Sequence, residues 1–187
     1  MQRNAEATKA RLLAAARAEF AAYGIAGARI DRIATEAESN KAQIYHYFGS
    51  KDGLFEAVFA GIGKEVVEGI PINVDDLPGY AAQLAIGNEA APEIMRLATW
   101  QRLERGGQSL LQVAVESNQA KIAAIAAAQA EGRISARYSP GVTLALVLHM
   151  SALWATMQPE LRSTVGLEDR TAQAEVVRQS VTDMLRP

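Results

Sequence analysis

Residues 40–48, NKAQIYHYF, place several polar side chains that suit nucleic-acid recognition on one short segment. On a helix of 3.6 residues per turn, Ile44 and Phe48 fall on one side and most of the polar groups on the other. A glutamine can pair with adenine, a lysine with guanine, and tyrosine or histidine with phosphate oxygens. The expected contact residues are Lys41, Ala42, Gln43, Tyr45, His46 and Tyr47. We therefore predict an exposed face that enters a groove of double-stranded DNA.

A second basic residue follows at the start of the next helix. Ser50-Lys51 precedes a run of apolar residues, so Lys51 lies in the first helical turn. A cation there opposes the helix dipole, whereas a phosphate would satisfy both the free N–H groups and the ammonium group. Lys51 is therefore predicted to bind the DNA backbone.

Catalytic and cofactor chemistry has little support in this chain. There is no cysteine, the two histidines (46 and 149) are far apart, and no HExxH, GxSxG or phosphate-loop pattern occurs. Asp75 and Asp76 are adjacent, but they are predicted to lie in a loop at a helix start. We expect no enzyme activity, no metal site and no cofactor.

The composition is that of a globular protein. Hydrophobic residues make up 49% of the 187 residues and charged residues 21%, with a formal net charge of −2. Residues 1–52 hold eight Lys/Arg and six Asp/Glu, which permits a basic face at the N-terminal end. The absence of cysteine and of a signal-peptide pattern favours a cytoplasmic location.

The periodicity of apolar residues predicts an all-α protein of about nine helices. Gly24 is expected to end the first helix, and 69–79 (GIPINVDDLPG) to form a loop at a domain boundary. The helices with assigned bounds cover about 8–23, 30–37, 40–48, 51 onward, 92–106, 109–132, 139–159 and 167–185.

The stretch 140–158 contains no Asp, Glu, Lys or Arg, so it is either in a membrane or buried on both sides. Its several polar residues and charged flanks favour burial, and we expect no membrane span. The small-residue stripe of this helix, together with Ala174, Val177, Val181 and Met184, predicts a homodimer through the last two helices.

The run 28–58, ARIDRIATEAESNKAQIYHYFGSKDGLFEAV, resembles the helix-turn-helix of the TetR family of transcriptional regulators. The matching features are Ile33-Ala34, Ala37, the IYHYF block at 44–48, and Lys51 followed by Leu54. The resemblance implies a DNA-binding domain at 4–64 and a helical domain at 65–187 that dimerises and binds a small molecule. It also implies base contacts from Lys41, Ala42 and Gln43, and phosphate contacts from Tyr45, His46, Tyr47 and Lys51. Arg29 would lie near the DNA backbone.

Three positions depart from the family pattern. Ala28 stands where a threonine usually caps the second helix, a loss of about 1 kcal/mol. The turn has Glu38-Ser39 instead of glycine and an apolar residue. A left-handed Glu38 would cost on the order of 1–2 kcal/mol, and its carboxylate would repel phosphate.

The remaining two-thirds of the chain are less informative. A cavity for a small, largely apolar effector could be lined by Phe59, Ile62, Trp100, Leu111, His149 and Trp154, although an ordinary core position is the better interpretation for any single one of them. The main hypothesis is a dimeric, ligand-responsive repressor that binds a near-palindromic operator. The alternative is a helical dimer of the same scaffold that acts as a protein-interaction module without sequence-specific DNA binding.

Overall fold

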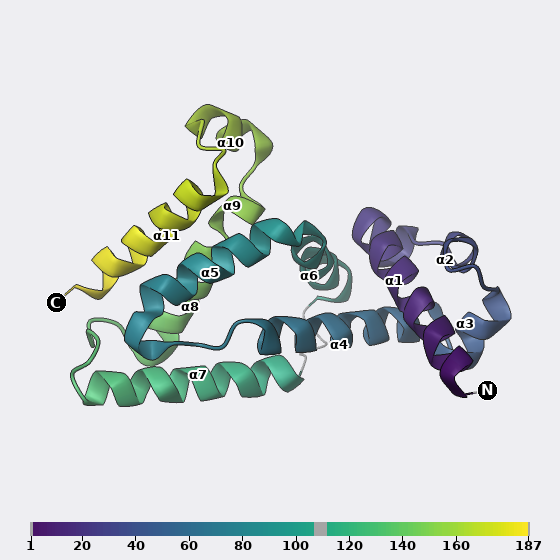
Figure 1. Ribbon diagram of the computed structural model, residues 1–187, viewed down its shortest axis with the longest axis horizontal. Helices are drawn as coiled ribbons and strands as arrows, with labels where there is room; N and C mark the ends of the chain where they lie inside the picture. Colours follow the sequence, from purple (N-terminus) through teal and green to yellow (C-terminus); the bar gives the residue numbers. More distant parts are fainter. Residues whose placement is uncertain (1, 107–111, 187) are drawn as a thin grey trace. The chain divides into compact units, whose positions relative to one another are not determined.

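The computed structural model describes residues 2–106 and 112–186, and this part contains helices and no strand (Figure 1). The prediction of an all-α fold is confirmed. The helices are α1 (Gln2–Gly27), α2 (Ile30–Glu36), α3 (Lys41–Phe48), α4 (Lys51–Gly69), a 3₁₀ helix η1 (Val74–Asp76), α5 (Leu77–Ala90), α6 (Pro92–Arg105), α7 (Gln112–Ala130), α8 (Pro140–Ser151), α9 (Leu153–Thr156), α10 (Pro159–Val165) and α11 (Arg170–Leu185).

The chain divides into two compact units that do not follow the order of the sequence. The first unit combines residues 1–65 with 93–111, and the second combines 66–92 with 112–187. Helix α6 therefore belongs to the same unit as α1, α2 and α3, although α5 separates it from them in the sequence. The chain leaves the first unit within α4 and returns to it for α6.

The first unit is held together by a continuous apolar core. Phe20 of α1 meets Phe55 of α4 edge to face, with ring centroids 5.2 Å apart. Ile33 of α2 and Ile44 of α3 are fully buried in the same cluster, and so is Leu97 of α6. Because α2 and α3 are too short to be stable alone, this burial is what fixes them.

Helix α1 is broken near its end. Gly24 has φ 72° and ψ −179°, a conformation open almost only to glycine, and the helical turn resumes beyond it. The predicted end of the helix at Gly24 thus marks a real break, although the helical segment continues to Gly27. A Cβ atom at position 24 would lie 2.5 Å from Glu104 Oε1 and 3.0 Å from the Trp100 ring.

The second unit packs α5 against both α8 and α11, and α8 against α7. Its core consists of Leu77, Tyr80, Ala81, Ala85, Ile125, Leu144, Val147, Trp154, Val177 and Val181. The Trp154 indole N–H donates to the Gln173 carbonyl at 3.0 Å. Arg162 of α10 donates to both carboxylate oxygens of Glu89 on α5, at 3.2 and 2.6 Å.

Two predicted segments differ from the structure. The uncharged stretch 140–158 forms α8 and α9, because the chain turns at Ala152 and the Ser151 carbonyl accepts from the Asn88 side chain. A separate helix, α10, then begins at Pro159. The predicted loop 69–79 is shorter, since Asp76 caps α5 and Pro78 occupies its first turn. Among residues 2–106 and 112–186, no helix is long and apolar enough to cross a membrane.

The residues chosen for the dimer seam are partly wrong. Ala174, Val177 and Val181 are buried within their own unit, where α11 packs on α5. Leu144 of α8 is likewise buried. The helical stripe was assigned to a partner chain because its apolar character alone cannot distinguish a core from an interface.

The break at Gly24 gives a stability prediction. Gly24→Ala should lower the free energy of unfolding by about 3 kcal/mol, since it adds backbone strain and overlap with Glu104 and Trp100. Gly166→Ala is the control, because Gly166 also has a positive φ (68°) but faces open space among the described residues. That control should cost only about 1 kcal/mol. Equal losses in urea denaturation would show that neither the greater backbone strain nor the contact with α6 adds to the cost at Gly24.

Candidate nucleic-acid interface

The turn between α2 and α3 is closed by backbone hydrogen bonds. Glu38 adopts a left-handed conformation with φ 49°, and the Ser39 N–H then reaches back to the Ala34 carbonyl at 2.9 Å. Arg11 of α1 donates to the Ala37 carbonyl at 3.1 Å, which ties the end of α2 to α1. The conformation suspected at Glu38 is therefore present, and its strain is held in place by these bonds.

Helix α3 begins with a side-chain cap and buries one face. The Asn40 side chain accepts from the Gln43 N–H at 2.9 Å, as the sequence predicts. Ile44 is fully buried, whereas Phe48 and Tyr47 are partly buried against the same core. The exposed residues of the helix are Lys41, Ala42, Tyr45 and His46, with Gln43 half-buried.

The two long side chains of the first turn are already engaged within the protein. The Ser39 hydroxyl donates to Gln43 Oε1 at 2.6 Å. The Lys41 ammonium lies 2.5 Å from Asp31 of α2, and hydrogen bonding to this carboxylate, together with its charge, raises the pKa of Lys41. Within the protein, Gln43 is thus bonded to the turn and Lys41 to α2.

The start of α2 is supported by Glu19 rather than by a cap at Ala28. Arg29 is the N-cap residue, and its own N–H donates to Glu19 Oε1 at 2.9 Å. Burial opposes ionisation of Glu19, but the bonds from Arg32 and the Arg29 N–H outweigh it and lower its pKa. This carboxylate therefore adds stability above its unfolded pKa, and the contribution is lost as the pH falls through the lower folded value.

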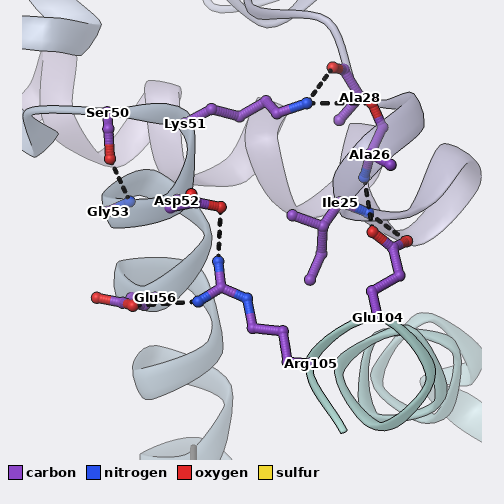
Figure 2. Close-up of polar contacts among 10 residues, drawn as sticks. All are labelled: Ile25, Ala26, Ala28, Ser50, Lys51, Asp52, Gly53, Glu56, Glu104 and Arg105. Carbon is purple, nitrogen blue, oxygen red and sulfur yellow. Dashed lines mark hydrogen bonds and ion pairs between the residues drawn. The ribbon is translucent and has the colours of Figure 1, made fainter.

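The one-turn segment after Gly24 is bound by opposite charges at its two ends (Figure 2). The Glu104 carboxylate of α6 accepts from the Ile25 N–H at 2.9 Å and from the Ala26 N–H at 2.8 Å. The Lys51 ammonium of α4 donates to the Ala26 carbonyl at 3.1 Å and the Ala28 carbonyl at 3.3 Å. An anion at free N–H groups and a cation at free carbonyls both match the helix dipole.

This contact changes the interpretation of Lys51. The sequence suggested that a lysine at the start of α4 is poorly placed unless a phosphate binds it. In the structure the Lys51 ammonium already donates to two carbonyls, so Lys51 also stabilises the segment that leads into α2. A lysine has three N–H donors, which leaves one for a phosphate oxygen.

Further ion pairs bind α6 to α1 and α4. Arg105 pairs with Asp52 at 2.7 Å and with Glu56 at 3.2 Å, both on α4 (Figure 2). Arg17 of α1 bridges Glu65 and Glu93 at 2.7 and 2.9 Å. The roles of these residues were not expected from the sequence, because such charges usually lie free on a helix surface. Each partner is between 48 and 79 positions away, and helical periodicity carries no information at that range.

The predicted effector residues lie in different units. Phe59, Ile62 and Trp100 belong to the first unit, and His149 and Trp154 to the second. Trp154 is buried in the core, whereas His149 is exposed and its Nδ1 lies 2.7 Å from the Ala145 carbonyl. Leu111 lies outside the described residues. A cavity shared by these six side chains stays a prediction.

Two open grooves lie in the first unit, and of the predicted effector residues that the structure describes only Ile62 lines either of them. One of about 520 Å³ between α1 and α2 is lined by Ala15, Glu19, Tyr23 and Arg32, among others. Another of about 320 Å³ between α1 and α4 includes Ile62 and Gly61. Across residues 2–106 and 112–186, the His, Asp and Glu side chains form no group of three that could hold a metal ion.

Two short helices joined by a tight turn, with the second exposing a polar face, define a helix-turn-helix protein. Residues 12–58 match the family model for bacterial regulatory proteins of the tetR family. Residues 76–186 match the model for a tetracyclin repressor-like C-terminal domain. The chain belongs to the TetR family, and the resemblance found in the sequence is confirmed.

Bacterial relatives support this assignment. The chain is 40% identical over 183 residues to the HTH-type transcriptional repressor SCO4008 of Streptomyces coelicolor, covering 92% of this chain and 95% of that one. The solved structure of the transcriptional regulator SCO4942 from the same species has 35% identity and a TM-score of 0.87, covering 96% and 99%. Salmonella enterica GusR shares the fold, with 20% identity, a TM-score of 0.69 and 95% coverage of both chains.

The turn residue Glu38 offers a direct test of strain and charge. Glu38→Gly should raise the free energy of unfolding by about 0.5–1 kcal/mol, because glycine adopts a positive φ without steric cost. It should also tighten binding to any DNA duplex, since a carboxylate is removed near the phosphates. Glu38→Gln is the matched control, because it removes the charge and keeps the Cβ atom.

The two variants should separate the two effects. We expect Glu38→Gln to tighten DNA binding without a gain in stability, as measured by urea denaturation and by fluorescence anisotropy at two salt concentrations. A Glu38→Gly protein no more stable than Glu38→Gln would contradict the strain at this turn.

Proposed function

We propose that this protein is a ligand-responsive transcriptional repressor that binds a near-palindromic operator as a dimer, in the cytoplasm. The observation that carries the proposal is the exposed first turn of α3, where Lys41, Ala42 and Gln43 stand on a helix anchored by Ile44. Their types match the donors and acceptors of base edges in a major groove. The family membership and the name of the 40% identical relative agree with this role.

Phosphate binding would come from residues around this helix. Tyr45 and His46 are exposed on α3, and Tyr47 is partly so. Lys51 keeps one donor beyond its two carbonyl bonds. Arg29, at the start of α2, is exposed as well. The opposing carboxylates of Asp31 and Glu38 would keep the affinity for arbitrary sequences low.

The response to an effector would pass through α6. This helix lies within the region matched by the C-terminal family model, yet it packs in the same unit as the helix-turn-helix. An effector that moved α6 would withdraw the Glu104 carboxylate from Ile25 and Ala26. The exposed Gly61 and buried Gly63 of α4 would ease such a shift, since glycines weaken a helix interior.

The effector is proposed to be a small, largely apolar molecule. Tyr80 supports a site in the second unit, because its side chain is 2% exposed and its hydroxyl has no partner among the described residues. Burial raises the pKa of Tyr80, so the group stays a hydrogen-bond donor. Lys121 of α7, which the sequence analysis did not consider, is half-buried, and desolvation lowers its pKa.

A dimer interface is proposed on the outward faces of α8 and α11. Val142 and Val176 are 46% and 41% exposed, and both are large apolar side chains. Ala145 and Ser180 are exposed on the same two helices and are small enough to permit close helix packing. A two-fold dimer would place its recognition helices one turn of DNA apart, about 34–36 Å.

DNA selection from a random-sequence pool tests the main proposal, and two variants test the residue roles. Lys51→Ala should weaken binding to all sequences alike and lower the salt dependence by about one counterion. Gln43→Ala should relax the preference at one base pair by about 1–3 kcal/mol. Failure of the wild-type protein to enrich any sequence would leave the protein-interaction module as the better function.

The dimer proposal makes a separate prediction. Val142→Arg combined with Val176→Arg should yield a monomer at micromolar concentration in sedimentation velocity, because two buried charges per subunit would face each other across the two-fold axis. Leu103→Arg is the control, since Leu103 is 67% exposed on α6 in the other unit. A dimeric double variant would place the interface elsewhere.

A further inference from the structure

We infer that Ser39 is a specificity-determining residue, because it sets the orientation in which Gln43 is presented to a base. The inference rests on the proposed DNA-binding function and goes beyond the contact residues assigned above. Its basis is the 2.6 Å hydrogen bond from the Ser39 hydroxyl to Gln43 Oε1. Ser39 itself would not touch DNA in this role, so it is a positioning residue.

Ser39 is a rigid support for this bond. Its backbone N–H donates to the Ala34 carbonyl at 2.9 Å, and the preceding Glu38 is fixed in a left-handed conformation. The next residue, Asn40, accepts from the Gln43 N–H at 2.9 Å. Gln43 is therefore held at its backbone by one turn residue and at its side chain by another.

The bond selects one end of the Gln43 amide. An amide oxygen can accept two hydrogen bonds, so the Ser39 hydroxyl takes one and leaves the other free beside the NH₂ donors. Adenine requires one acceptor and one donor side by side from the same amide. A glutamine without this restraint samples several rotamers and both amide orientations, and loses that freedom only on binding. Ser39 removes part of that cost in advance.

The neighbouring contact shows the same arrangement. Asp31 holds the Lys41 ammonium at 2.5 Å, so both long side chains of the first turn have partners outside α3. Lys41 can still swing away, because the pair is mostly exposed and such pairs are weak. The Ser39 bond is partly buried, so it restrains Gln43 more firmly than the exposed ion pair restrains Lys41.

The test is a double-mutant cycle on base preference. The probe is the duplex that the wild-type protein selects from a random pool, together with its three substitutions at the base pair whose preference Gln43→Ala relaxes. Ser39→Ala, Ser39→Thr, Gln43→Ala and Ser39→Ala/Gln43→Ala are measured by fluorescence anisotropy against these four duplexes and one unrelated duplex. Thermal melting of each variant verifies folding.

Ser39→Ala should reduce discrimination at that base pair about three- to tenfold, the worth of one ordinary hydrogen bond, with unchanged affinity for the unrelated duplex. In the Gln43→Ala background it should have no further effect. Ser39→Thr keeps the hydroxyl and should restore most of the preference. A merely structural role would instead weaken all five duplexes equally in both backgrounds.

Three outcomes would overturn the inference. In the first outcome, Ser39→Ala keeps the wild-type base preference at the base pair where Gln43→Ala loses it. In the second, Ser39→Ala changes base discrimination equally in the wild-type and Gln43→Ala backgrounds. In the third, Ser39→Thr discriminates between bases no better than Ser39→Ala. A wild-type protein that enriches no sequence would instead overturn the proposed function, and the inference with it.

Discussion

The first unit depends on the bond between the Glu104 carboxylate and two backbone N–H groups of a broken helix. Gly24 interrupts α1, which exposes the N–H groups of Ile25 and Ala26 where the chain turns towards α2. An unpaired backbone donor away from water costs as much as a lost hydrogen bond. Because the acceptor comes from α6, the conformation that precedes α2 and α3 is completed only when α6 is docked (Figure 2).

Charged side chains of both signs bind the backbone between Ile25 and Arg29. Glu104 lies at the start of the one-turn segment and Lys51 at its end, and Glu19 supports the next helix through the Arg29 N–H. Side chains from other helices thus stabilise this segment and the start of α2. Glu19 accepts from the N–H of the N-cap residue itself, so the bond that a capping side chain would make to the first turn of α2 stays unmade.

Much of the first unit could be predicted from the sequence, because its signals are local. The Asn40 cap, the inward Ile44 and the left-handed turn at Glu38 depend on neighbours within a few positions, and the structure has all three. The contacts of Glu104 and Arg105 could not be predicted, since their partners are 49 to 79 positions away.

In the second unit, apolar periodicity identified helices but did not distinguish a core from an interface. Ala174, Val177 and Val181 were assigned to a dimer seam, and they pack instead inside their own unit. The break between α8 and α9 at Ala152 was also missed, and the Ser151 carbonyl beside it accepts from Asn88, 63 positions away in the sequence. Sequence spacing describes a helix face, and only the tertiary structure says what covers that face.

The membership of α6 in the first unit also has a consequence for synthesis on the ribosome. Residues 1–65 emerge first, but the buried Leu97 and the acceptor for Ile25 and Ala26 are made only about thirty to forty residues later. The helix-turn-helix would therefore stay incompletely folded on the ribosome until α6 leaves the exit tunnel. Exchange of everything after residue 65 for another family member's sequence would have to bring residues in α6 that fit against Gly24 and pair with Asp52.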